Sequence, residues 1–312
     1  MGAKLPAKKI METNLNPERF RHLEIPDRVE IATGHGGLPF VKIQTPWSTA
    51  EIYLNGAHVT HFQKFGEPPL LFMSAKSYFA PGKPIRGGIP ICYPWFGNRA
   101  GGPSHGFVRS LAWELAETSA TPDGAVTLRL HLPKTSLPAE WSGLRTDLVV
   151  RVADKLMVGL SAKNESDGQT LEIENCLHSY FYVGDISTVS LTGLRAAPFN
   201  DFAAGDTGTQ KMENDPVLRI AKETNRVYAD STSTVEIRDE NLRRTISVEK
   251  LNSLSTVVWN PWTTQKMPDD FDPAEHQIMV CVESGNVKQN KISLAPGETT
   301  TLGIVLSSAP LK

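Results

Sequence analysis

The sequence has few cysteines and no long hydrophobic segment. Its three cysteines, Cys92, Cys176 and Cys281, are far apart in the chain and form no CxxC pair. They therefore predict neither a disulfide framework nor a cysteine-ligated zinc site. Reduced thiols are typical of the cytosol, so we expect a cytoplasmic protein. No run approaches the roughly 20 apolar residues that a membrane span needs, and the first ten residues lack the apolar stretch of a signal peptide.

An excess of charge of either sign is also absent. The 312 residues include 32 Lys and Arg against 34 Asp and Glu, for a formal net charge of −2. This balance gives no reason to expect binding to nucleic acid or to an anionic membrane surface. An anionic ligand would have to be bound by a few cations that the fold brings together.

Sequence motifs for metals and nucleotides are missing as well. There is no HExxH motif and no Cys/His cluster, and the sequence contains no P-loop, no GxGxxG and no GxSxG. His58 and His61 lie three residues apart in an expected strand, so their side chains should point to opposite faces and cannot chelate one ion. We therefore expect no metal ion and no cofactor.

Alternation of apolar and polar residues is the pattern that is present. In residues 126–132 Val and Leu alternate with Thr, Arg and His, which is typical of a strand with one buried face. Similar runs occur at residues 51–54, 57–62, 148–152, 156–162, 171–177, 235–237, 245–248, 256–259, 277–282 and 300–306. Helical periodicity is limited to short segments at residues 17–22 and 136–141, and residues 238–244 are expected to connect two strands of a hairpin.

Many short strands separated by turn signals favour an all-β sandwich or barrel. A β-sandwich can reach this length as one unit, so we expect a single domain over residues 40–312. Residues 1–39 are poorer in pattern and are expected to form an N-terminal extension that packs on the domain or trails from it.

Two arginines lie in a long segment, residues 79–109, that breaks the strand pattern. Arg86 precedes two glycines, which tolerate tight turns and let the backbone approach a bound group closely. Arg109 follows His105 and Gly106. A guanidinium group presents a fork of donors that suits phosphate or carboxylate. The alternative is that each arginine is a surface residue beside a turn, but two in one loop region favour an anion site.

His178 and Glu283 are the candidates for proton transfer. His178 closes the alternating run 171–177, and imidazole titrates near neutral pH. Glu283 follows the apolar run 277–282, and burial at the end of such a strand would raise its pKa towards the range of a useful base. The alternatives are a half-buried strand histidine and a solvated turn glutamate.

These segments together resemble a known family. The motifs are RGGIP at 86–90, YPWFG at 93–97, HGFVR at 105–109, HSYF at 178–181, VVWNPW at 257–262, and Glu283. In this order they resemble the hexose-6-phosphate mutarotases (glucose-6-phosphate 1-epimerases), which belong to the aldose 1-epimerase superfamily. The resemblance covers residues 41–306, and it implies a large antiparallel β-supersandwich.

The resemblance also implies a role for individual residues. His178 and Glu283 match the catalytic pair of the family, and Arg86 and Arg109 match the arginines that hold the substrate phosphate. Ser104 and His105 match positions that line the pocket. Asn225 departs from the pattern, because the family usually has an acidic residue there; an amide carries no charge and donates as well as accepts hydrogen bonds.

The expected activity is then interconversion of the α and β anomers of a hexose 6-phosphate, foremost glucose 6-phosphate, by a monomer that needs no cofactor. Two alternatives stay open. One is an aldose 1-epimerase that acts on unphosphorylated sugars, and the other is a non-catalytic carbohydrate-binding or regulatory β-sandwich.

Overall fold

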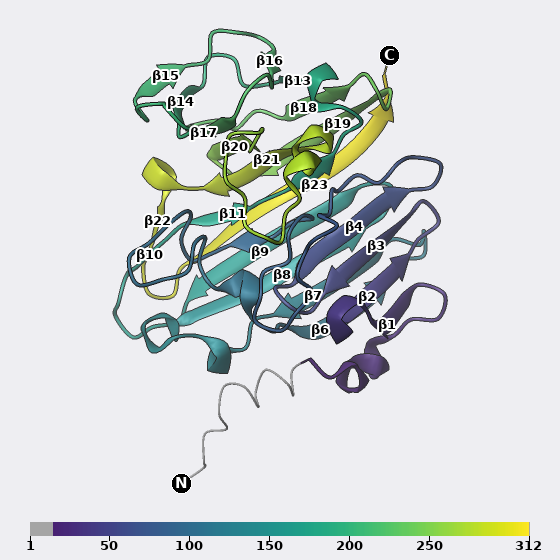
Figure 1. Ribbon diagram of the computed structural model, residues 1–312. Coiled ribbons are helices and arrows are strands. Elements are labelled where there is room, and N and C mark those ends of the chain that lie inside the picture. The colour runs from purple at the N-terminus through teal and green to yellow at the C-terminus, as the bar shows by residue number, and fades with distance from the viewer. Residues whose placement is uncertain (1–14, 312) are drawn as a thin grey trace.

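Nearly all regular structure in the protein is β-strand. The computed structural model describes residues 15–311, and its helices are short 3₁₀ turns (Figure 1). They are η1 (Pro17–Leu23), η2 (His35–Gly37), η3 (Val108–Ser110), η4 (Lys134–Ser136), η5 (Ala139–Trp141), η6 (Ile186–Thr188), η7 (Pro273–Ile278) and η8 (Lys288–Asn290). The expected all-β class is confirmed.

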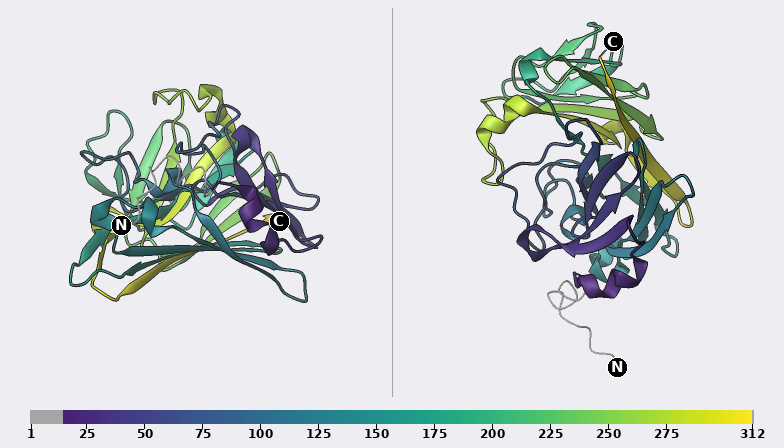
Figure 2. Two further views of the ribbon diagram at one scale, coloured as in Figure 1. Left: turned by 90° about the horizontal axis from the view of Figure 1, so that it is seen from below. Right: turned by 90° about the vertical axis from the view of Figure 1, so that its right-hand side faces the viewer.

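The largest layer is a nine-stranded antiparallel sheet with β23 in its centre. Its order is β16 (Leu218–Arg219), β13 (Val189–Thr192), β18 (Val235–Asp239), β19 (Arg244–Leu251), β23 (Thr299–Pro310), β9 (Leu156–Asn164), β8 (Leu144–Val152), β7 (Val126–His131) and β6 (Glu114–Ala120). In the left view of Figure 2 its long teal and yellow strands lie along one side of the molecule, and the other elements lie on the opposite side.

An eight-stranded sheet carries most of the site described below. Its order is β15 (Gln210–Met212), β14 (Pro198–Asp201), β17 (Thr224–Tyr228), β20 (Ser255–Asn260), β21 (Met279–Asn286), β11 (Asn175–Leu177) and β5 (Ile91–Cys92), with β12 (Tyr180–Tyr182) also paired to β21.

Two smaller sheets complete the architecture. One has four strands, β1 (Val29–Thr33), β2 (Pro39–Gln44), β3 (Ser48–Tyr53) and β4 (His58–Lys64), and the other pairs β10 (Leu171–Ile173) with β22 (Ile292–Leu294).

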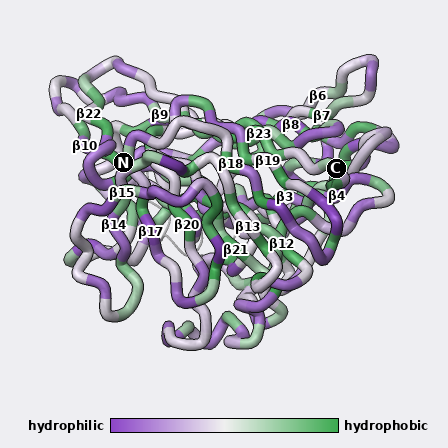
Figure 3. Tube along the Cα trace, turned by 90° about the horizontal axis from the view of Figure 1, so that it is seen from above, coloured by the Kyte–Doolittle hydropathy of each residue, from purple (hydrophilic) through white to green (hydrophobic). Residues whose placement is uncertain are grey.

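The alternating residues of the long strands build the core. Leu130 on β7, Leu148 on β8 and Leu160 on β9 are partners across neighbouring strands, and all three are buried. Because successive side chains of a strand point to opposite faces, the polar residues between them remain at the outer face. Each fully buried leucine contributes about 1.5–3 kcal/mol. Figure 3 shows the resulting distribution, with hydrophobic segments in the central strands and hydrophilic ones in the peripheral loops.

Four expected elements, two strands and two short helices, differ in detail from the structure. The expected strand at 171–177 is divided into β10 and β11 at Glu174, whose carboxylate accepts hydrogen bonds from the backbone N–H groups of Phe96 (2.9 Å) and Lys288 (2.6 Å). Residues 277–278 end η7, and the strand begins at Met279. The two expected short helices are 3₁₀ turns.

We expected the first 39 residues to form an N-terminal extension. Residues 1–14 of it lie outside the part of the chain that the structure describes. Residues 15–39 pack on the domain: Phe20 is buried, and β1 pairs with β2. None of the helices within residues 15–311 has the length and hydrophobicity to span a membrane.

Candidate active site

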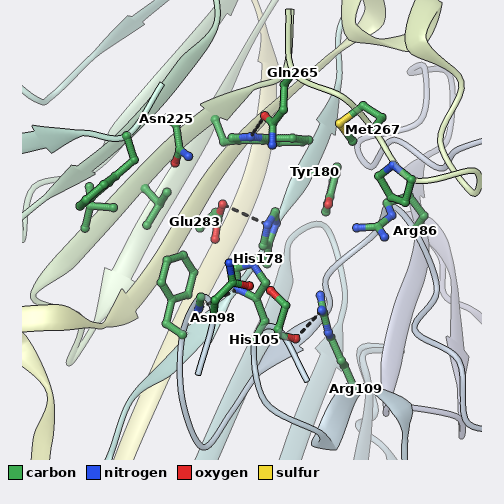
Figure 4. A pocket seen from close by; sticks show the side chains of 18 of the residues that line it. Arg86, Asn98, His105, Arg109, His178, Tyr180, Asn225, Gln265, Met267 and Glu283 are labelled. Carbon is green, nitrogen blue, oxygen red and sulfur yellow. Dashed lines mark hydrogen bonds and ion pairs between the residues drawn. The ribbon is translucent and has the colours of Figure 1, made fainter. Parts of the chain in front are cut away.

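A cavity of about 550 Å³ lies against the eight-stranded sheet. Strands β17, β20 and β21 form its floor, and the loops around residues 86–109 and 261–272 form its walls. The seven residues singled out from the sequence all line it: Arg86, Ser104, His105, Arg109, His178, Asn225 and Glu283 (Figure 4). The fold therefore brings them together, while their individual roles stay predictions.

Strand register places His178 next to Glu283. β11 pairs Leu177 with Ser284 on β21, and β12 pairs Tyr180 with Cys281. His178 lies between these two pairings and so falls opposite Glu283. Nε2 of His178 is 3.2 Å from Oε1 of Glu283, which is close enough for a proton to pass between them. Both side chains are buried.

Aromatic contacts hold the imidazole ring of His178. The ring stacks on Tyr180, with centroids 4.7 Å apart and planes at 13°. Edge contacts come from Trp259 at 6.2 Å and from His105 at 5.7 Å. Within the described residues Nδ1 of His178 is buried and has no hydrogen-bond partner. Proton exchange of this ring within the pair therefore runs through Nε2.

Burial shifts both members of the pair towards their neutral forms. Desolvation is the largest cause that raises the pKa of Glu283 well above 4.5, and the thiol of Cys176, 3.5 Å from Oε2, and Arg109 only partly oppose it. Desolvation also holds the pKa of His178 well below 6.5, and the positive charges of Arg109 and Arg86 lower it further. Both shifts favour the neutral forms of the pair, in which the proton is on Glu283 and His178 is uncharged.

The two glycines after Arg86 serve the protein backbone. Gly87 has φ of 110° and Gly88 has φ of 61°. A Cβ at Gly87 would lie 2.5 Å from the carbonyl oxygen of Phe72, and one at Gly88 would lie 2.3 Å from that of Val59. The sequence suggested that these glycines let the backbone approach a bound group; in the structure both lie against protein backbone, at Phe72 and at Val59 on β4. A side chain at either position would clash with that backbone directly after Arg86.

The two arginines differ in their partners. Nη2 of Arg86 is 3.2 Å from each carboxylate oxygen of Asp270. Nη2 of Arg109 donates to the carbonyl oxygen of Ser104 at 2.6 Å, and no carboxylate within residues 15–311 forms an ion pair with Arg109. Figure 4 shows both arginines on one side of His178 and Glu283. An anion bound on this side would therefore meet one fully available positive charge and one that is partly neutralised.

The remaining predicted residues are polar and uncharged. Burial and the nearby cations lower the pKa of His105 to about 3, so His105 is neutral at physiological pH and can only donate and accept hydrogen bonds. Asn225, on β17, lies on the side of the pair away from the arginines in Figure 4. These residues suit the hydroxyl groups of a neutral ligand portion.

The donor groups near the pair fit proton transfer better than a metal ion. The ligand atoms of His178, Cys281 and Glu283 lie within 4.8 Å of one another. Burial raises the pKa of the Cys281 thiol well above 9.0, and a protonated thiol is a poor ligand because metals bind the thiolate. The positive charges of Arg86 and Arg109 would also repel a cation here.

Several residues around the cavity were not selected from the sequence. Tyr180 and Trp259 both contact the His178 ring. Gln265, Met267 and Lys288 line the cavity, and Asp270 holds Arg86. Tyr180 lies in the motif HSYF, which was a usable signal, whereas Lys288 and the segment after Trp262 carry no pattern that distinguishes them from surface loops.

Replacing Glu283 by glutamine tests where the shared proton resides. Folded Glu283 keeps a proton that the unfolded chain releases above pH 4.5, so wild-type stability falls as pH rises through that range. We expect the free energy of unfolding of E283Q minus that of wild type to increase by about 1.4 kcal/mol per pH unit, until the folded carboxyl group ionises. Urea unfolding at pH 5, 6 and 7 measures this gain. A difference that is constant or shrinks with pH would contradict a raised pKa.

Comparisons with known proteins identify the family. The family model described as aldose 1-epimerase matches residues 39–307. A protein of Cenchrus ciliaris, provisionally named glucose-6-phosphate 1-epimerase, is 33% identical over 84% of this chain and 82% of its own length. One from Escherichia coli K12, with the same provisional name, is 33% identical over 81% of this chain and 85% of its own length.

A solved structure gives the same result. The crystal structure of YeaD from Salmonella typhimurium, described in provisional terms as a mutarotase, has a TM-score of 0.81 and 27% identity, and it covers 94% of this chain and 99% of that one. The expected antiparallel β-supersandwich of this superfamily is thereby confirmed. A family model that spans most of the residues and relatives that align over most of their length lead to one conclusion: the chain belongs to the aldose 1-epimerase family.

Proposed function

We propose that the protein interconverts the α and β anomers of a hexose 6-phosphate, with glucose 6-phosphate as the foremost candidate. The observation that carries the proposal is the arrangement of one cavity. A buried imidazole and carboxyl group lie 3.2 Å apart, and two arginines line the same cavity on one side of them. The first feature suits proton transfer at an anomeric centre, and the second suits a phosphate at the far end of the same sugar.

Anomer exchange requires the pyranose ring to open, the C1–C2 bond to rotate and the ring to close. Opening delivers a proton to the ring oxygen and removes one from the anomeric hydroxyl group, and closure reverses both transfers. In the proposed mechanism His178 donates to the ring oxygen and Glu283 accepts from the hydroxyl group. Each positioned acid or base contributes about 10²–10⁴-fold. The reaction consumes no proton overall, so the pair returns to its starting state.

For His178 to donate a proton and Glu283 to accept one, the shared proton must be on His178 when the sugar ring opens. Burial lowers the pKa of His178, and the charges of Arg109 and Arg86 lower it further. A phosphate bound to these arginines offsets their charge, so the pKa of His178 rises on binding. The proton can then pass from Oε1 of Glu283 to Nε2 of His178 across 3.2 Å. In this way the phosphate would orient the sugar and also prepare the acid.

Glutamine at position 283 should abolish the reaction. The side chain keeps its shape and polarity in E283Q but no longer accepts a proton, so we expect kcat for anomerisation of glucose 6-phosphate to fall by at least about 10²-fold. Exchange spectroscopy by NMR, corrected for the uncatalysed rate, measures it. Calorimetric binding of inorganic phosphate serves as the control and should be retained. Wild-type turnover in E283Q would refute the assignment of the base.

Arg109 provides the cleanest test of phosphate recognition, because its other hydrogen bond goes to a backbone carbonyl group. In R109A we expect KM for glucose 6-phosphate to rise about tenfold to a hundredfold, which corresponds to one lost charge-assisted hydrogen bond. KM for glucose should stay unchanged. R99A is the matched control, since Arg99 belongs to the same loop, stacks on Trp95 and does not line the cavity. An equal change for both sugars would contradict the phosphate role.

The effect of phosphate on His178 can be separated from its effect on orientation. Inorganic phosphite can occupy the anion site while unphosphorylated glucose occupies the rest of the cavity. We expect phosphite to increase kcat for glucose severalfold in wild type, because it offsets the two positive charges that disfavour protonated His178. The increase should disappear in R109A. Phosphite that leaves glucose turnover unchanged, or that only inhibits it, would show that the phosphate acts as an anchor alone.

A further inference from the structure

Arg86 is held by a buried carboxylate outside the cavity. Its Nη2 donates to both oxygens of Asp270 at 3.2 Å, and the side chain of Asp270 is only 7% exposed. Asp270 is not among the residues that line the cavity. Exposed ion pairs contribute little, but this pair is largely removed from solvent and lies directly behind a cavity wall.

The segment that carries Asp270 is anchored along its length. It connects β20 to η7, and Gln265, Met267 and Pro268 within it line the cavity. Nε1 of Trp259 donates to Oε1 of Gln265 at 2.9 Å, and the hydroxyl group of Thr264 donates to Oε2 of Glu223 at 2.6 Å. At the far end, Asp272 caps η7. The carboxylate of Asp270 therefore has a defined place from which it can hold Arg86.

The guanidinium group of Arg86 has few polar contacts besides Asp270. Within residues 15–311 its Nε is buried without a hydrogen-bond partner, its ion pair is with Asp270, and the hydroxyl group of Tyr180 also interacts with it. A free arginine side chain has large rotamer entropy, and a fork that is already oriented loses less of it when it binds an anion. Asp270 supplies the charged contact that orients Arg86, and Tyr180 adds a neutral one.

We propose that Asp270 is a positioning residue for anion recognition: it holds Arg86 so that the guanidinium group is already oriented when a phosphate enters the cavity. This inference rests on the proposed function, in which Arg86 contacts the phosphate of the substrate. Phosphate recognition would then also involve Asp270, which lies about 180 positions after Arg86 in the chain. The negative charge of Asp270 also repels a phosphate, and this repulsion would weaken phosphate binding. Removal of Asp270 therefore weakens binding if positioning dominates and strengthens it if repulsion dominates.

The test compares D270A and D270N with D269N. Asp269 is the exposed neighbour and has no recorded ion pair with Arg86, so D269N removes the same charge from the same segment. We expect D270A to raise KM for glucose 6-phosphate about tenfold and to weaken binding of inorganic phosphate to the same extent. The value of kcat and the KM for glucose should not change. D270N, which is isosteric and keeps one acceptor for Nη2, should show a smaller rise in KM, and D269N should match wild type.

Each outcome decides the proposal. A KM for glucose 6-phosphate that is unchanged or lower in D270A, or in D270N should D270A fail to fold, would overturn the positioning role. Equal loss for glucose and glucose 6-phosphate would show a purely structural role and would also overturn it. A wild-type enzyme that turns over glucose, does not turn over glucose 6-phosphate and does not bind phosphate would overturn the proposed phosphate recognition. This inference would then fall with it. A preference for glucose 6-phosphate that D270A retains in full would overturn the inference alone.

Discussion

The site depends on the continuous register between β21 and the two short strands that pair with it. β11 and β12 meet β21 on either side of residues 178–179, and this interruption leaves His178 facing Glu283. The consequence is a titratable pair in a place where neither charged form is well solvated. Burial of this kind is costly for stability, and it is also what makes the two pKa values differ so far from those of exposed side chains.

Neighbouring groups offset part of the cost of that burial. Aromatic rings hold the ring of His178, whose Nδ1 has no hydrogen-bond partner among the described residues, and the Cys176 thiol gives Glu283 a weak donor. The cations that an anionic ligand needs come from the loop region around residues 86–109. Glu174 joins this region to a second loop through the backbone of Phe96 and Lys288. Binding groups and reacting groups thus come from different elements of one scaffold.

The sequence predicted the parts of the molecule that follow local rules. Alternation identified most long strands, because a strand with one buried face must alternate, and the seven residues that the resemblance singled out all line the cavity. Short strands such as β5 and β16 were missed, since two residues carry no period. Asp270 was missed for another reason: its partner is Arg86, far away in the chain, and only the folded structure brings the two together. The glycines at 87 and 88 were recognised as necessary, but the backbone that requires them could not be identified from their own segment.

The position of β23 in the nine-stranded sheet has a consequence for how the chain is made. This strand lies between β19 and β9, so it joins two groups of four strands that have no direct pairing with each other. It also comes after every other strand of this sheet in the chain. The two halves of the sheet must therefore wait, with their inner edges open, until β23 has been synthesised. Assembly of the complete layer is a late and long-range event, and a nascent chain that stops short of β23 would expose two unpaired edges at once.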